Sequence, residues 1–434
     1  MFHSGTYEKG KIMRKKVWFL MLGTMGFVVG FALGENGSST NTIPSSKKEN
    51  PNIAISIHTS IHSGDTNRVV KKPSFLQQIK DSKDGNIDFS KYIGSAHGFL
   101  PVPIIVTEPA VGFGGGVAFL FLHDSIKNRI EREKEKSSDG KLRHIPPPSV
   151  SGVAGFGTEN ESWGAGAFHL GIWREDTIRY LGAAGYASIN YDFYGLGERV
   201  PVNVSGIFLL QQITSRLGKS NFFLGANYSL IQAKAKRSHS FGLLPPPAEE
   251  GREVTSGGLS PILEYDSRDN IFTPNKGYNA KLEWSYYDNW LGSDNQFSLL
   301  TVNNRVWFPI AETLVLGIRL DGNFSGGDVP FYMLPFIHLR GIPAMRYQGR
   351  HLLTSELELR WDVTPRWSLV GFAGAGWTSR DDISDLTESD THPAGGFGFR
   401  YLIARIFNLR TGIDFGFSEE EQSIYFITGS AWAW

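Results

Sequence analysis

Residues 352–363 read Leu-Leu-Thr-Ser-Glu-Leu-Glu-Leu-Arg-Trp-Asp-Val, and apolar side chains alternate in them with charged ones. One face carries Leu353, Leu357, Leu359, Trp361 and Val363, and the other carries Glu356, Glu358, Arg360 and Asp362. A period of two is typical of an extended strand with two different faces. Residues 314–324 and 406–417 show the same alternation, which continues from about residue 100 to the C-terminus.

A soluble β-sandwich shows the same period as a membrane barrel. Strand length and the placement of aromatic residues distinguish the two folds. Most predicted strands have about 11–15 residues, more than globular sheets use and enough to cross a tilted bilayer. Tryptophans lie near the strand ends, at Trp173, Trp290, Trp307, Trp361, Trp367, Trp377, Trp432 and Trp434. Such rings are typical of the girdles of an outer-membrane barrel. Because backbone groups in lipid must be paired, we expect the sheet to close around a charged, wet lumen.

Composition excludes several classes of protein. The 434 residues hold 43 Lys+Arg against 43 Asp+Glu, so no basic surface favours a nucleic-acid partner. There is no cysteine, which excludes disulfides, thiolate metal sites and a cysteine nucleophile. We expect no cofactor.

The N-terminal third of the chain changes character twice. Arg14, Lys15 and Lys16 precede an apolar run that ends at Gly34, so residues 1–34 are a predicted signal peptide, with Met13 as an alternative start and a retained anchor as the other interpretation. Residues 35–97 are polar and predicted to be largely disordered, with order expected near Ile87–Ile93, where the barrel begins. Residues 98–434 are the predicted barrel domain.

We expect sixteen strands, because single-chain bacterial barrels have an even number. They are predicted at 101–107, 109–122, 148–158, 161–173, 177–190, 201–215, 220–233, 256–268, 277–289, 295–308, 312–324, 351–363, 366–378, 392–403, 405–417 and 422–434. The longer connections at 191–200, 234–255, 325–350 and 379–391 are predicted to be extracellular. The long charged segment 124–147 falls on the periplasmic side, against this trend.

Two clusters stand out as candidate sites. The first is Asp266, Arg268 and Asp269, followed by Pro274 and Gly277, at a predicted strand–turn–strand; its simplest interpretation is structural. The second is Arg340-Gly341, in a loop far longer than a hairpin needs. A guanidinium folded into the lumen requires carboxylate partners, and the inward-facing Glu358 and Glu356 are the candidates. The alternative is a structural role, in which Arg340 only holds the loop in place and the loop plugs the pore.

Both clusters resemble motifs of the BamA/TamA-type outer-membrane assembly factors, also called the bacterial surface antigen family. The first resembles the family's D-x-R-D…P-x-x-G turn, and Leu339-Arg340-Gly341-Ile342 resembles the V-R-G-F/Y motif of its sixth extracellular loop. The resemblance covers about residue 99 to 434 and implies a second acidic partner in an F-x-D-x-G motif. Gly374 stands in that position here, and inward-facing Asp414 is the candidate replacement.

The C-terminus supports the same resemblance. Residues 423–434 are predicted to form an amphipathic strand that ends on an aromatic residue. Phe426, Trp432 and Trp434 resemble the terminal signal by which outer-membrane barrels are recognised for insertion.

Enzymatic and metal sites find little support. His169, His338 and His392 have no serine or aspartate at a spacing typical of a hydrolase, so we predict no catalytic residue. His58 and His62 have the spacing of a helical metal pair, but lie in the polar segment without an acidic residue between them, so no metal site is predicted.

The resemblance implies insertion or translocation of polypeptide, or of lipid, at the outer membrane of a Gram-negative bacterium. The family's periplasmic POTRA domains have no counterpart in the pattern of residues 35–97. Expected partners are outer-membrane lipid including lipopolysaccharide, the machinery that inserts the barrel itself, and unfolded outer-membrane polypeptides. A loop-gated channel for small solutes and a surface-exposed antigen or adhesion scaffold remain alternatives.

Overall fold

The computed structural model describes residues 79–95, 98–123, 149–194, 200–237, 251–379, 382–387, 389–419 and 421–432. The predicted signal peptide, residues 35–78, the candidate pair His58/His62 and Trp434 lie outside these ranges. No helix in the described part of the chain is long and apolar enough to cross a membrane.

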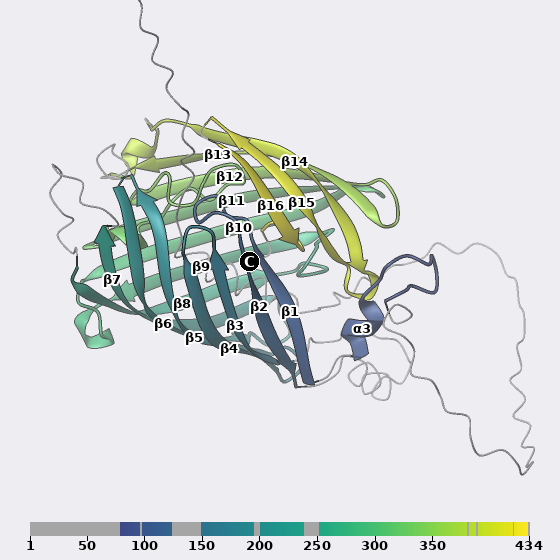
Figure 1. Ribbon diagram of the computed structural model, residues 1–434, viewed down its shortest axis with the longest axis horizontal. Coiled ribbons are helices and arrows are strands. Elements are labelled where there is room, and N and C mark those ends of the chain that lie inside the picture. Colours follow the sequence, from purple (N-terminus) through teal and green to yellow (C-terminus); the bar gives the residue numbers. More distant parts are fainter. Residues whose placement is uncertain are drawn as a thin grey trace, which may run out of the picture.

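Sixteen strands form one antiparallel sheet in which each strand pairs with its neighbours in sequence, as Figure 1 shows. The all-β barrel with sixteen strands is therefore confirmed, and the short predicted first strand exists. Their bounds are β1 Gly98–Val106, β2 Gly114–Leu122, β3 Val150–Thr158, β4 Trp163–Trp173, β5 Ile178–Phe193, β6 Val200–Arg216, β7 Phe222–Arg237, β8 Glu253–Asp266, β9 Gly277–Tyr287, β10 Phe297–Ala311, β11 Leu314–Gly327, β12 His351–Asp362, β13 Trp367–Ser379, β14 His392–Ala404, β15 Leu409–Ser418 and β16 Gln422–Thr428.

The two ends of the barrel are distinguished by their connections. We call the end where β1 begins and β16 ends the terminal end, and the opposite end the loop end. β2 ends and β3 begins at the terminal end, so the connection 124–148 joins strands there, as the strand count requires. The residues of that connection lie outside the described part of the chain. The long connection 328–350, between β11 and β12, starts from the loop end.

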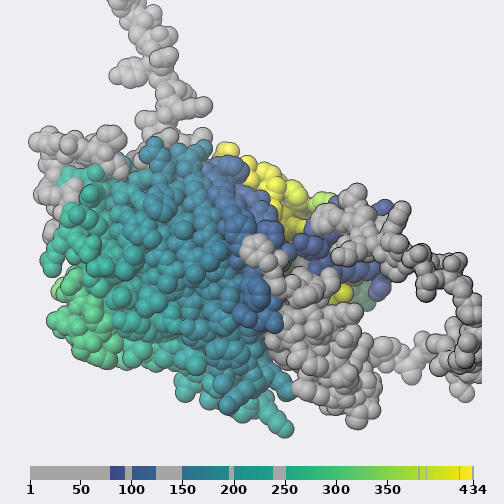
Figure 2. All heavy atoms as spheres, turned by 60° about the horizontal axis from the view of Figure 1, so that its bottom comes forward, coloured from purple at the N-terminus to yellow at the C-terminus, as the bar shows by residue number. Residues whose placement is uncertain are grey.

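Strand alternation directs apolar side chains outward. On β12 the outward side chains of Leu357 and Trp361 are each 49% exposed, whereas the inward side chain of Glu356 is 2% exposed. The same wall continues around the molecule, and Figure 2 shows its side from β1 in blue through the teal strands that follow. A charged face turned inward and an apolar face turned outward is the arrangement of a membrane barrel.

The lumen has two different halves. Inward residues of β1 to β7, such as Leu120, Ile189 and Val204, are apolar and belong to one buried cluster. Inward residues of β10 to β15 are mainly charged, among them Arg319, Glu356, Arg400 and Asp414. The expectation of a charged lumen is therefore right for one half and wrong for the other.

Aromatic rings mark both ends of the membrane-facing wall on β4 and β5. β4 is 11 residues long and begins and ends on tryptophan. Trp163 packs against Tyr186 near the loop end, and Trp173 stacks on Tyr180 at the terminal end. At about 3.3 Å per residue β4 spans about 35 Å, and a tilt of about 40° brings this close to the 25 Å apolar band of such barrels.

The predicted girdle position is wrong for two of the tryptophans. Trp307 and Trp432 are buried, and their rings contact each other inside the barrel with centroids 6.1 Å apart. Gly317 leaves the room, because a Cβ there would lie 2.7 Å from the Trp432 ring and 3.3 Å from that of Trp307. The strand predicted over 422–434 is also wrong beyond Thr428, where β16 ends.

Replacing Leu357 by lysine tests the membrane-facing wall. This residue lies at the middle of β12 and points outward, so the charge costs about 2–4 kcal/mol of unfolding free energy in a bilayer. Denaturant unfolding in lipid vesicles measures it. The control Val363→Lys, just past the end of the same strand and 45% exposed, costs about 0–1 kcal/mol. Equal losses at the two positions would contradict the assignment.

Candidate functional site

The connection between β11 and β12 fills the lumen. We call residues 328–350 the plug loop. Its Tyr332, Phe336, Ala344 and Met345 are buried in the same cluster as the inward residues of β1 to β6. A second apolar group in the loop, Ile337, Leu339 and Ile342, packs with Leu352 on β12. The loop therefore contributes to the core of the barrel rather than to its outer surface.

Arg340, at the inner tip of the plug loop, is surrounded by the charges that the sequence predicted for it. Its guanidinium lies 2.9 Å from Glu356 Oε1, 2.7 Å from Glu358 Oε2 and 2.7 Å from Asp414 Oδ2. The Phe372 ring covers one face of the guanidinium at 3.7 Å. Burial opposes the charge, but the three carboxylates outweigh it and raise the pKa of Arg340 above its ordinary value.

Packing at Gly374 explains why the second acidic partner comes from another strand. A Cβ at Gly374 would lie 2.4 Å from the Ser355 carbonyl oxygen and 3.0 Å from Leu339 of the plug loop. An aspartate at this position therefore has no room. Asp414 on β15 reaches Arg340 instead and is itself held by Arg400, at 2.5 and 2.8 Å.

Gly341 connects the plug loop to the last two strands. Its φ of 106° is unfavourable for other residues, and a Cβ there would meet the Phe417 backbone at 2.8 Å. The Gly341 N–H donates to the Tyr425 hydroxyl at 2.9 Å, and the Ser418 hydroxyl donates to the Gly341 carbonyl at 2.9 Å. The Arg-Gly pair thus needs both an ion-pair partner and a residue without a side chain.

His338 lies in the same loop, but its side chain is exposed. Its carbonyl accepts a hydrogen bond from Arg319 at 3.0 Å. The surrounding protein and the nearby charge of Arg319 lower the pKa of His338. The imidazole is therefore neutral at physiological pH. His392 stacks on Tyr347 of this loop, with ring centroids 3.6 Å apart.

The strand–turn–strand cluster shapes a turn at the terminal end. Arg268 binds Asp266 with two hydrogen bonds of 2.8 Å. Asp269 accepts hydrogen bonds from the backbone N–H groups of Asn275 and Lys276, at 2.9 and 3.2 Å.

The rest of this cluster closes the turn. The Pro274 carbonyl accepts a hydrogen bond from Arg360, at 3.2 Å. At Gly277, where φ is 117°, a Cβ would lie 2.4 Å from the Ser267 carbonyl oxygen. These contacts support the structural interpretation of the cluster.

The C-terminal segment turns into the lumen instead of completing β16. Gly429, with φ of 82°, bends the chain, and Ser430 N–H bonds to the Phe272 carbonyl. The Trp432 indole then donates to Glu356 Oε2 at 2.5 Å, and Arg305 donates to the Trp432 carbonyl. Trp432 therefore shares a carboxylate with Arg340. Phe426 remains on β16.

The first and last strands do not pair. Among the described residues, β1 has a ladder only with β2, and β16 only with β15. A hydrogen bond joins the two edges, since Phe426 N–H donates to Thr107 Oγ1 at 3.1 Å. Thr107 follows the last residue of β1, so this contact lies at its loop end. β16 continues for about 7 Å beyond Phe426, whereas the nine residues of β1 span about 30 Å. We call this unpaired boundary the seam.

A segment that the sequence analysis assigned to the disordered region is ordered against the terminal end. We call residues 79–95 the strap; it contains a β-bridge between Lys80 and Ile87 and the helix α3 (Ser90–Ser95). Phe89 N–H bonds to the Ile403 carbonyl, and the Tyr401 hydroxyl bonds to the Ile87 carbonyl. The strap leads from the β14–β15 turn to β1, and so it crosses the seam, as Figure 1 shows.

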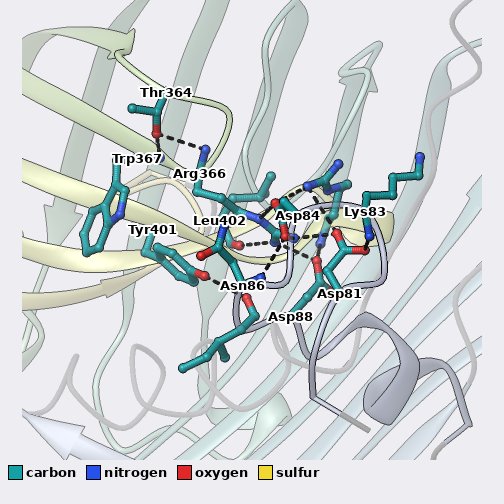
Figure 3. A network of polar contacts seen from close by, with 12 residues as sticks. Asp81, Lys83, Asp84, Asn86, Asp88, Thr364, Arg366, Trp367, Tyr401 and Leu402 are labelled. Carbon is teal, nitrogen blue, oxygen red and sulfur yellow. Dashed lines mark hydrogen bonds and ion pairs between the residues drawn. The ribbon is translucent and has the colours of Figure 1, made fainter. Parts of the chain in front are cut away.

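Arg366, between β12 and β13, holds the strap through three carboxylates (Figure 3). Its guanidinium lies 2.6 Å from Asp81, 2.7 Å from Asp84 and 2.7 Å from Asp88. Arg405 adds contacts to Asp84 at 2.5 Å and to Asp81 at 3.1 Å. We call these five residues the clasp. The hydrogen bond from Arg366 is the main reason that the pKa of Asp84 lies well below its ordinary value.

The outer wall holds one polar cluster that the sequence analysis missed. Ser151 Oγ lies 2.8 Å from His123 Nε2 and 2.8 Å from His169 Nδ1. Nothing in the spacing indicated it, because Ser151 and His169 come from β3 and β4 and His123 directly follows β2, and only the register of these strands aligns them. No cluster of three His, Asp or Glu side chains in the described ranges is arranged to hold a metal ion.

Comparisons with known proteins bear on the fold. No protein-family model matches the chain, and no curated protein sequence matches it. Among solved structures, CdiB from Acinetobacter baumannii matches with a TM-score of 0.51 at 10% identity, over 76% of this chain and 59% of that one. BamA from Haemophilus ducreyi lacking POTRA domains 1-3 matches at 0.49 with 14% identity, over 76% and 69%.

A third match is CdiB from Escherichia coli, at 0.49 with 11% identity, over 73% of this chain and 58% of that one. The chain spans less than two thirds of either CdiB. This barrel shares the fold of CdiB. The resemblance to outer-membrane assembly barrels is thereby confirmed at the level of the fold.

Removal of the Arg340 guanidinium leaves buried carboxylates without their shared partner. We expect Arg340→Ala to lower the free energy of unfolding by about 3–5 kcal/mol, measured by denaturant titration in lipid vesicles. The control is Arg350→Ala in the same loop, where one hydrogen bond to the Gly327 carbonyl is lost and the cost is about 1 kcal/mol. Similar losses in both variants would show that Arg340 contributes no more than an ordinary loop contact.

Arg366→Ala tests the clasp. Arg366 and Asp88 are both buried, so we expect the variant to lower the local opening free energy of the strap by about 3 kcal/mol while the barrel stays folded. Amide hydrogen exchange over residues 79–95 measures it, with the more exposed Arg405→Ala as a milder control. In the wild type docking lowers the pKa of Asp84, so protonation of this carboxylate weakens docking as the pH falls below about 4. A strap that stays protected in Arg366→Ala would refute the role of the clasp.

Proposed function

We propose that this protein is an integral outer-membrane barrel of a Gram-negative bacterium that inserts or translocates polypeptides through the seam between β1 and β16. The terminal end then faces the periplasm, as in single-chain bacterial barrels. The apolar outer wall with its two aromatic bands supports the membrane location. Lipid, including lipopolysaccharide, would surround the wall, and the cell's own assembly machinery would insert it.

The seam is the observation that carries this proposal. Along most of β1 no described strand pairs with the outer edge. Each unpaired backbone group in hydrocarbon costs several kcal/mol, so the edge favours the addition of another strand. An unfolded outer-membrane polypeptide supplies such strands, and main-chain pairing accepts any sequence.

The plugged lumen weighs against a freely open solute channel. The plug loop fills the apolar half, and its Arg340 and Trp432 meet at Glu356 in the charged half. Passage through the lumen requires these contacts to break, whereas lateral entry at the seam leaves them in place.

Cross-linking across the seam tests the proposal, and the absence of native cysteine makes introduced thiols unique. We expect wild-type barrel in vesicles to accelerate the folding of an added unfolded outer-membrane protein. A reducible link between Thr107→Cys and Phe426→Cys, which contact each other across the seam, should abolish the acceleration, and reduction should restore it.

The control pair Val117→Cys and Gly155→Cys lies across the paired ladder of β2 and β3, where a link should have no effect. Planar-bilayer conductance measured in parallel separates the channel alternative. Steady conductance in the wild type, with folding activity indifferent to the seam link, would overturn the proposal. Arg340→Ala should open conductance only if the loop gates a pore.

A further inference from the structure

The cluster of His123, Ser151 and His169 lies on the membrane-facing side of the barrel. Ser151 pairs directly with Phe121 on β2 and with His169 on β4. Phe121 is 48% exposed, whereas its neighbours Leu120 and Leu122 are buried in the lumen core. Since side chains that pair in register share a face, Ser151 and His169 point outward with Phe121. Hydrogen-bonding groups on a lipid-facing wall cost free energy, and side chains of this kind are therefore candidates for a functional site.

The depth of the cluster matches that of lipid ester groups. His169 lies two outward positions before Trp173, and its ring is 6.3 Å from Trp173 and 6.0 Å from Tyr180. Interfacial tryptophan and tyrosine rings lie at the level of the headgroups, with the acyl chains beginning just beyond. The ester carbonyls of a phospholipid occupy this boundary. Phe121 and Val153 beside Ser151 are exposed and apolar, and so provide a surface for an acyl chain.

The hydrogen bonds give Ser151 a base and a donor together. A hydroxyl between two imidazoles donates its proton to one ring nitrogen and accepts from the N–H of the other. Both contacts measure 2.8 Å, within the range that links a nucleophile to its base. The His169 ring is held in place by Trp173 and Tyr180 and contacts the His123 ring at 5.4 Å. Either imidazole can accept the Ser151 proton, and the other imidazole is then the donor.

We propose that Ser151 is the nucleophile of a second, catalytic site that hydrolyses acyl esters of phospholipids in the adjacent leaflet. Ser151 Oγ attacks the ester carbonyl carbon and its proton passes to the accepting imidazole, while the N–H of the other imidazole faces the negative oxygen. The bond to the glycerol oxygen breaks, and that oxygen takes the proton. Water, deprotonated by the same imidazole, then releases the fatty acid and restores the serine.

This site rests on the membrane location in the proposed function but not on the seam, since it lies on β2 to β4. The test uses the full-length barrel in vesicles of phosphatidylethanolamine and phosphatidylglycerol with labelled acyl chains. We expect release of labelled fatty acid and covalent labelling of Ser151 by a fluorophosphonate, located by peptide mass spectrometry. Ser151→Ala should abolish both, and His123→Ala or His169→Ala should lower the rate by about 10²- to 10⁴-fold.

Ser188→Ala is the matched control, because Ser188 also lies on the outer side of its strand and bonds to a side chain, Asn203, but has no histidine partner. It should retain full hydrolysis and labelling. The seam-linked variant should keep hydrolysis while losing polypeptide insertion, so that failures of the two proposals are distinguishable. A folded wild-type barrel that neither releases fatty acid nor reacts with the fluorophosphonate would overturn the site. Altered lipid retention in Ser151→Ala without hydrolysis would also overturn it and leave a headgroup-binding cluster.

Discussion

The requirement that backbone groups in hydrocarbon be paired governs this structure. It accounts for a single sheet in which every strand bonds to its neighbours in sequence, with apolar side chains on the outer face. The requirement is met at fifteen boundaries between neighbouring strands and left open at the sixteenth, between β1 and β16. Here β16 stops at Thr428, and Gly429 directs the chain inward. The free edge thus results from a particular turn.

The inward turn of the C-terminus is linked to the plug. Trp432 of the C-terminal segment and Arg340 of the plug loop both contact the buried carboxylate of Glu356. Gly341 of the plug loop also bonds to Tyr425 on β16. The last strand is therefore held from the lumen side by the plug and by its own tail, and on the side of β1 by the hydrogen bond from Phe426 N–H to Thr107. On the β1 side of the seam, the strap connects the start of β1 to the β12–β13 and β14–β15 turns through Arg366 and Arg405.

Sequence reasoning reached what local periodicity and charge can determine. Alternation over residues such as 352–363 predicted the strands and their faces, and the need of Arg340 for carboxylates pointed to Glu356, Glu358 and Asp414, which the structure brings together with it. Burial of Trp307 and Trp432 could not be predicted, because it depends on the space left by Gly317 on another strand. The clasp joins residues more than 270 positions apart, and its aspartates look like ordinary solvated charges in a polar segment. Likewise, the apolar inner face of β1 to β7 is explained only by the plug loop that covers it.

Under the proposed function, the balance of contacts favours the seam over the lumen as the path that opens. Emptying the lumen separates Arg340 from three carboxylates and exposes the apolar residues of the plug loop, and a buried ion pair broken on one side costs about 3–5 kcal/mol by itself. Opening the seam breaks the hydrogen bond from Phe426 N–H to Thr107, and such a bond contributes about 1 kcal/mol. The strap restrains that opening at the terminal end, where the clasp holds it to the barrel. Under the proposed function, an incoming strand that pairs with β1 would gain backbone hydrogen bonds, whereas a solute in the lumen would first have to displace the core of the barrel.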